Sequence, residues 1–146
     1  IPGQRSSPYE MGLGWTVNLD KQGYFVGRRA LEREHREGSS WQLVGLEIDW
    51  EGLEREYAVV GMPPQVPASA VRGSVPVYAG PRQVGYASTS TWSPVLKKYI
   101  ALVHLQQPYF TPGTKVEIEV TVEHHRRKSP ATVVKLPFYD PEWKKK

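Results

Sequence analysis

Residues 115–122 (KVEIEVTV) constrain the fold more than any other part of this sequence, because apolar and polar side chains alternate along them. Successive side chains of a strand point to opposite sides of a sheet. The apolar members would therefore share one face, and these are Val116, Ile118, Val120 and Val122. The pattern predicts a strand with one face in a core and the other in water.

Four further runs have a β-type composition and are separated by turn residues. They are residues 41–48 (WQLVGLEI), 83–91, 100–105 and 132–135. Pro112 and Gly113 suit the middle of a type II turn just before the alternating strand. Many short strands with turns between them favour a mainly β protein, either a small antiparallel barrel or a sandwich.

Two segments fall outside this β pattern. Residues 27–38 (GRRALEREHREG) carry opposite charges at four-residue spacing and end in a glycine, which predicts a surface helix. Residues 51–72 show no clean period and contain the run MPPQVP. We expect this second segment to be a long surface loop, and a loop of that length in a compact domain is usually functional or mobile.

The composition excludes several kinds of chemistry. The chain has no cysteine, which removes disulfides, thiolate catalysis and cysteine-ligated metals. Its four histidines lack the spacing of metal ligands, so we predict no metal site, and we expect His104 to face the core or the rim of the sheet. The hydroxyl-rich run STSTWSP lacks a G-x-S-x-G motif, and no two carboxylates are paired by spacing. We therefore predict no catalytic residue in this chain.

Charge and hydropathy bear on possible partners. The net charge is +4, and the positive residues are concentrated at 124–128 (HHRRK) and 144–146. We interpret these runs as a solvated turn and a solvated tail, and we expect no nucleic-acid surface. No apolar run approaches the roughly 20 residues that a membrane-spanning helix needs, so we expect no membrane partner. The first residues do not resemble a secretory signal, although a truncated start could have lost one.

Aromatic residues stand in segments where no strand or helix is expected. Trp15 follows a Gly-Leu-Gly run, and Tyr139 and Trp143 lie in the proline-containing tail. Aromatic side chains beside polar groups can form stacking walls for a flat heteroaromatic ligand, but they can equally serve simple packing. The residues alone leave both interpretations open.

Ordered motifs along most of the chain allow a comparison with known families. The first is SPYEMGLGWTVNLDKQGYFVGRRAL at residues 7–31, followed by QLVGLEI, GSVPVY, VGYASTSTWSPVLKKYIAL, PGTKVEIEV and VVKLPFYDP. From about Pro8 to Pro141 the sequence resembles the glycine cleavage T-protein (aminomethyltransferase) family. It departs from the family at residues 51–72, which form a longer connection than usual, and at STSTWSP, where members commonly have a pattern such as T-S-G-x-x-S-P.

The resemblance covers the C-terminal portion of the family's three-domain pattern. It implies that residues 1–38 are the end of the second, folate-binding domain, with a strand and the surface helix. Residues 39–146 would be a small antiparallel Greek-key barrel, the third domain. The catalytic aspartate and most of the folate pocket would belong to the N-terminal domains of the same protein, so this part alone should be inactive.

The family also implies a cofactor and partners. Its members use tetrahydrofolate as the acceptor of a one-carbon unit, and Trp15 matches the family tryptophan beside the folate. Trp143 falls where some members place a folate-contacting tyrosine, and Glu10 matches the carboxylate of the P-x-E motif, whose role could be structural. The implied donor partner is the lipoyl carrier (H-protein), and the implied location is cytoplasmic. A tetrahydrofolate-dependent demethylase of the same family and a stand-alone protein-binding barrel remain as alternatives.

Overall fold

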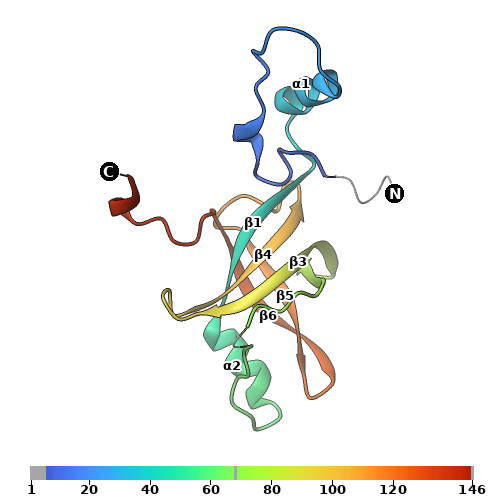
Figure 1. The fold of residues 1–146 in the computed structure, drawn as a ribbon. Helices are drawn as coiled ribbons and strands as arrows, with labels where there is room; N and C mark the ends of the chain where they lie inside the picture. The colour runs from blue at the N-terminus through green and yellow to red at the C-terminus, as the bar shows by residue number, and fades with distance from the viewer. Residues whose placement is uncertain (1–5, 68, 146) are drawn as a thin grey trace.

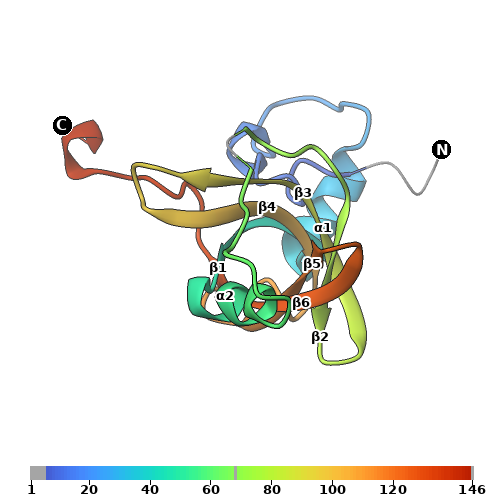
Figure 2. The same cartoon turned by 90° about the horizontal axis from the view of Figure 1, so that it is seen from below.

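The computed structural model describes residues 6–67 and 69–145. Within them, six antiparallel strands close into a barrel in the order β1-β4-β3-β2-β5-β6. Figure 1 shows the barrel from the side, and Figure 2 labels every strand. The strands are β1 Trp41–Ile48, β2 Val75–Ala79, β3 Arg82–Ser93, β4 Lys98–Gln106, β5 Lys115–Val122 and β6 His125–Val134. The mainly β prediction is confirmed, and barrel closure excludes the sandwich.

The barrel has Greek-key connectivity. Strands β2, β3 and β4 follow one another as neighbours, and β1 lies beside β4, so the chain must cross from β1 to β2 through a long connection. That connection contains the whole of residues 51–72, which we expected to form a loop. The expectation was wrong at its start, because helix α2 spans Trp50–Ala58.

Local signals explain helix α2. The Asp49 carboxylate accepts a hydrogen bond from the Gly52 amide at 3.1 Å, as an N-cap does. Leu53 and Tyr57, four residues apart, are both buried. A Cβ on Gly52 would lie 2.6 Å from the Pro130 ring, so the glycine lets the helix pack closely on β6. The helix was missed because it is short and its apolar stripe contains only two large residues.

The core occupies the inside of the barrel. Val116, Ile118 and Val122 of β5 are buried as the alternation predicted, whereas Val120 is half-buried and packs against a smaller cluster beneath α2. The main cluster draws on all six strands and consists of Val44, Leu46, Ile48, Val77, Val84, Ala87, Ala101, Val103, Leu105, Val116, Ile118, Ala131 and Val133.

The basic run 124–128 differs from our expectation of a solvated turn. Only Glu123 and His124 take the left-handed conformation of the hairpin turn, with φ of 49° and 64°. The remaining residues belong to β6, because its strand pairing with β5 extends back to His125. The positive charges there are partly compensated: Arg127 lies 3.5 Å from a carboxylate oxygen of Glu56, and Lys128 lies 3.8 Å from one of Glu117.

Residues 6–40, here called the N-terminal segment, lie at the end of the barrel opposite α2 (Figure 1). They contain the short helix η2 Gly14–Thr16 and helix α1 Arg28–Glu37, which confirms the helix expected at 27–38. The strand expected in this part of the chain does not occur among residues 6–38. Not one residue from 6 to 43 is buried.

The C-terminal tail leaves the barrel after β6 and ends in η3 Glu142–Lys145. Both ribbon views show it standing away from the barrel (Figures 1 and 2). Phe138 anchors its start, because a Cβ on Gly45 of β1 would lie 2.6 Å from a carbon of the Phe138 ring. The absence of a side chain at Gly45 therefore makes room for that ring.

Candidate functional site

Trp15 stands at the surface of the N-terminal segment, with 84% of the residue exposed. It borders a hollow of about 550 Å³ together with Tyr9, Asn18, Asp20 and His35. The rings of Tyr9 and His35 lie 5.7 Å apart between centroids. An open indole beside polar groups and two further rings is suited to stacking on a flat ligand.

The backbone around Trp15 is held by its own turns. The Leu13 amide donates to the Pro8 carbonyl at 2.7 Å, and the Thr16 hydroxyl donates to the Leu13 carbonyl at 2.7 Å. A Cβ on Gly14 would lie 2.8 Å from the Tyr9 ring, so this glycine permits the close packing of the turn. These local contacts fix the backbone that carries the indole.

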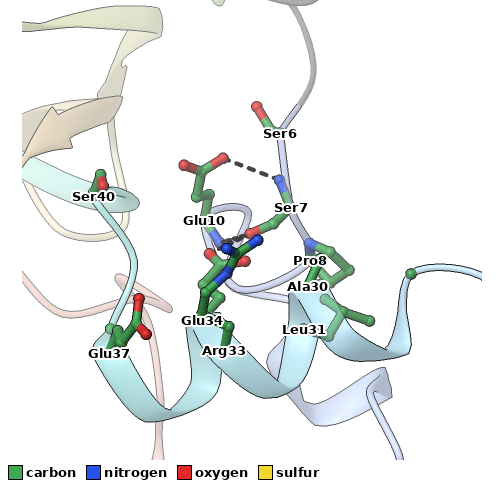
Figure 3. Close-up of a pocket in the computed structure, with 12 residues that line it drawn as sticks. Ser6, Ser7, Pro8, Glu10, Ala30, Leu31, Arg33, Glu34, Glu37 and Ser40 are labelled. Carbon is green, nitrogen blue, oxygen red and sulfur yellow. Dashed lines mark hydrogen bonds between the residues drawn. The ribbon is translucent and has the colours of Figure 1, made fainter.

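Glu10 closes the turn that precedes Trp15. Its carboxylate accepts a hydrogen bond from the Ser7 amide at 3.0 Å, and its own amide donates to the Ser7 hydroxyl at 3.1 Å. Glu10 lines a hollow of about 730 Å³ together with residues of α1. Figure 3 shows Arg33 and Glu34 of α1 on the other side of this hollow from the turn that carries Glu10. The structure thus places Glu10 and Trp15 beside different hollows.

Trp143 lies in η3 and is 66% exposed. The described residues that line the hollow beside Trp15 do not include Trp143. Both ribbon views separate η3 from η2 (Figures 1 and 2). Among the described residues that line the hollows beside Trp15 and Glu10, no two of the three residues expected to bind the cofactor occur together, and both tryptophans are exposed.

His104 is a residue whose setting the sequence did not reveal. Its strand neighbours Val103 and Leu105 point into the core, so His104 lies on the outer face of β4, yet it is only 9% exposed. Its Nε2 lies 3.2 Å from Sδ of Met11, and its ring centroid lies 5.5 Å from that of Tyr86. Burial lowers the pKa of His104 below the ordinary histidine value, while the Glu10 carboxylate acts in the opposite direction.

The hydroxyls of STSTWSP are used within the barrel. Ser90 and Tyr99 share a hydrogen bond of 3.2 Å, Ser88 donates to the Leu102 carbonyl at 3.3 Å, and Ser93 accepts from the Leu96 amide at 3.3 Å. Across residues 6–67 and 69–145, no three metal-binding side chains are grouped. In the same part of the chain, no helix is long and apolar enough to cross a membrane.

The structural class of this chain is a closed six-stranded Greek-key barrel. The N-terminal segment, which contains helix α1 and the exposed Trp15, precedes the barrel. Residues 42–140 match the glycine cleavage T-protein C-terminal barrel domain. The chain belongs to that family, as its motifs indicated.

Relatives of known name agree with this assignment. An aminomethyltransferase of Prochlorococcus marinus (strain NATL2A) is 34% identical over 134 residues, which are 92% of this chain and 30% of that protein. One from Bacillus pumilus (strain SAFR-032) is 32% identical over 133 residues, or 91% of this chain and 31% of that protein. The chain therefore spans only about a third of the length of these relatives.

A solved structure has the same fold. The crystal structure of glycine cleavage system aminomethyltransferase T from Bartonella henselae aligns with a TM-score of 0.67 and 18% sequence identity. The alignment covers 91% of this chain and 32% of the other. At that identity the likeness supports the fold.

Proposed function

We propose that this chain is the C-terminal part of a tetrahydrofolate-dependent aminomethyltransferase and forms one wall of its folate cavity. The observation that carries the proposal is Trp15, an indole 84% exposed on a short turn held by its own hydrogen bonds. A large exposed aromatic side chain on a fixed backbone loses little freedom on binding a flat ring such as a pterin. The other domains of the same protein would supply the acid–base group.

The two remaining residues have different parts in this proposal. Trp143, on the tail anchored by Phe138, would close over the folate from a second side when the tail moves. Glu10 would support the wall by closing the turn that leads to Trp15, through its bond to the Ser7 amide. Direct contact between Glu10 and the folate is the alternative.

The proposed partners follow from the family. The N-terminal domains would cover the exposed apolar side chains of the N-terminal segment, among them Leu13, Tyr24 and Val26. A lipoyl carrier protein (H-protein) would deliver the aminomethyl group, and transfer to tetrahydrofolate would release ammonia. Holding donor and acceptor together while water is excluded is what a ring of domains can do. We place the protein in the cytoplasm, which cell fractionation would test.

The proposal can be tested by calorimetric titration of tetrahydrofolate into the longer protein, in which the N-terminal domains complete the proposed folate pocket. We expect Trp15→Ala to weaken binding by about 3- to 10-fold, the size of one aromatic stacking contact. Tyr24→Ala is the matched control, because Tyr24 is also exposed in the same segment but does not line the hollow beside Trp15. Equal losses in both variants, or no loss with Trp15→Ala, would argue against the folate wall.

An activity assay is the second test of the proposed function. The 146-residue chain should form no methylenetetrahydrofolate from the aminomethyl-loaded lipoyl carrier, since the proposal places catalysis in other domains. Activity of the chain alone would contradict that division. In the longer protein, a preference for an N-methylated donor over the lipoyl carrier would instead identify the demethylase alternative.

A further inference from the structure

We infer that His104 is a positioning residue: through Met11 it holds the N-terminal segment against the end of the barrel, and it releases that segment when its imidazole gains a second proton. The inference concerns the contact region between the N-terminal segment and the barrel, here called the joint. It stands without the folate proposal, and only its consequence for Trp15 rests on that proposal.

The joint consists of few polar contacts. Three hydrogen bonds between described residues connect the N-terminal segment to the barrel and to the turn after β4. The Leu43 amide donates to the Glu10 carbonyl at 2.7 Å, and the Gln107 amide donates to the Ser40 carbonyl at 2.9 Å. The third, between Nε2 of His104 and Sδ of Met11 at 3.2 Å, joins two side chains. No residue of the segment is fully buried, so no core side chain of the segment reinforces these bonds.

The partner atom selects the tautomer of the neutral His104 ring. A thioether sulfur carries no proton and can only accept, so Nε2 must hold the hydrogen and donate it to Met11. In the neutral ring Nδ1 is then a bare acceptor, and it is buried without a hydrogen-bond partner among the described residues. A second proton would create a buried N–H at Nδ1 with nothing to accept it, which is costly.

The surrounding charges do not remove this cost. The titratable groups that face His104 are the carboxylate of Glu10, in the N-terminal segment, and the phenol of Tyr86, on β3. Glu10 favours the protonated ring, but burial has the larger effect, and the pKa of His104 is lowered. The docked segment therefore prefers neutral His104, because Met11 of the segment lies against the ring, as Tyr86 on β3 of the barrel does, and adds to its burial.

The sign of the pH dependence follows. When the segment lifts away, water reaches the ring and its pKa returns towards about 6.5. The pKa is lower in the docked state, so docking is strongest above that value and weakens as the pH falls towards the lowered pKa. Trp15 lies four residues after Met11 on the same series of turns, so its position depends on the same contact.

Hydrogen exchange at two amides tests this inference. The Leu43 amide, bonded to the Glu10 carbonyl, reports on the joint. The Asp49 amide, which donates to the Pro130 carbonyl at 2.9 Å, reports on the barrel near α2. Between about pH 7.5 and about pH 5, we expect the protection factor of Leu43 to fall about tenfold relative to that of Asp49. A ratio that does not change with pH would overturn the inference.

Two variants test whether the pH dependence of Leu43 protection arises from the contact between His104 and Met11. His104→Phe keeps a ring but can neither donate nor gain a proton, so Leu43 protection should already be low at about pH 7.5 and should no longer depend on pH. A retained pH dependence would contradict a role for His104. If His104→Phe also lowers Asp49 protection, the variant disturbs the barrel itself, and Met11→Leu then becomes the deciding test. Met11→Leu removes the acceptor sulfur and keeps an apolar side chain of similar size.

Met11→Leu should reduce Leu43 protection at about pH 7.5 by roughly 3- to 10-fold and leave Asp49 unchanged. Leu13→Ala is the control in the same segment, because Leu13 is 46% exposed and makes none of the three bonds of the joint. Equal Leu43 protection in wild type and Met11→Leu would overturn the inference. None of these measurements involves folate, so they can fail or succeed independently of the proposed function.

Discussion

The barrel and the N-terminal segment are ordered by different forces. Each of the six strands contributes at least one buried residue, and Leu46, Val77 and Val103 are 0% exposed. In the N-terminal segment no residue is buried, and Val44 is the first buried residue along the described chain. The barrel therefore has its own core, whereas the segment leaves large apolar side chains such as Trp15, Tyr24 and Val26 exposed.

Polar contacts take the place of a core in the segment. One carboxylate oxygen of Glu34 accepts hydrogen bonds from Ser7 at 2.6 Å and from Ser39 at 2.5 Å. The Arg28 guanidinium donates to three backbone carbonyls in the loop before α1, those of Leu19, Lys21 and Gly23. Such bonds determine the shape of the segment, but each adds only a modest net stability.

The largest effect should come from the barrel core. Leu46→Ala removes a side chain that is 0% exposed and leaves a cavity, so we expect a loss of about 2–5 kcal/mol in the free energy of unfolding. Leu13→Ala, the same substitution at a residue 46% exposed in the segment, should cost no more than about 0.5 kcal/mol. Urea denaturation followed by circular dichroism measures both. Similar losses in the two variants would show that the N-terminal segment depends on apolar packing as much as the barrel does.

An intermediate effect should be confined to the segment. Arg28→Lys keeps the positive charge but cannot reach three carbonyls and Glu32 at once, so the loop at residues 19–23 should open. We expect tryptic cleavage after Lys21 to become about tenfold faster, with the urea midpoint of the barrel unchanged. Arg36→Lys is the control, because the Arg36 side chain is 73% exposed and, within residues 6–67 and 69–145, pairs only with its neighbour Glu37. A lower urea midpoint with Arg28→Lys would mean that the segment and the barrel unfold together.

This contrast also explains what could be predicted from the sequence. The alternation in β5 and the glycines that flank α1 are local signals, and both elements lie where we predicted them. The burial of His104 could not be predicted, because its strand places it on the outer face and residues far away in the chain cover it. Helix α2 was missed although Asp49 caps it, because it is short and its apolar stripe contains only two large residues. The early start of β6 depends on its pairing with β5, which the sequence of residues 124–128 alone does not contain.

For the candidate site, too, local features could be predicted from the sequence, but the arrangement of distant segments could not. The exposed aromatic character of Trp15 and Trp143 follows from their irregular surroundings, and the structure presents both at the surface. Whether they face one cavity depends on how the tail and the segment are arranged in space. Glu10 illustrates the difficulty, because a motif residue expected beside the cofactor closes a turn with Ser7.

The smallest effect should come from a polar contact on the barrel itself. Lys98 and Glu47 form an ion pair of 2.6 Å on neighbouring strands, with side chains 50% and 32% exposed. Glu47→Gln should cost less than about 1 kcal/mol, because solvent screens an exposed pair and the core beneath it is intact. The difference between wild type and variant should shrink further between about 0.01 M and about 1 M salt, since the Debye length falls from about 30 Å to about 3 Å. A loss above about 2 kcal/mol that persists in high salt would show that the barrel, like the segment, depends on its polar contacts.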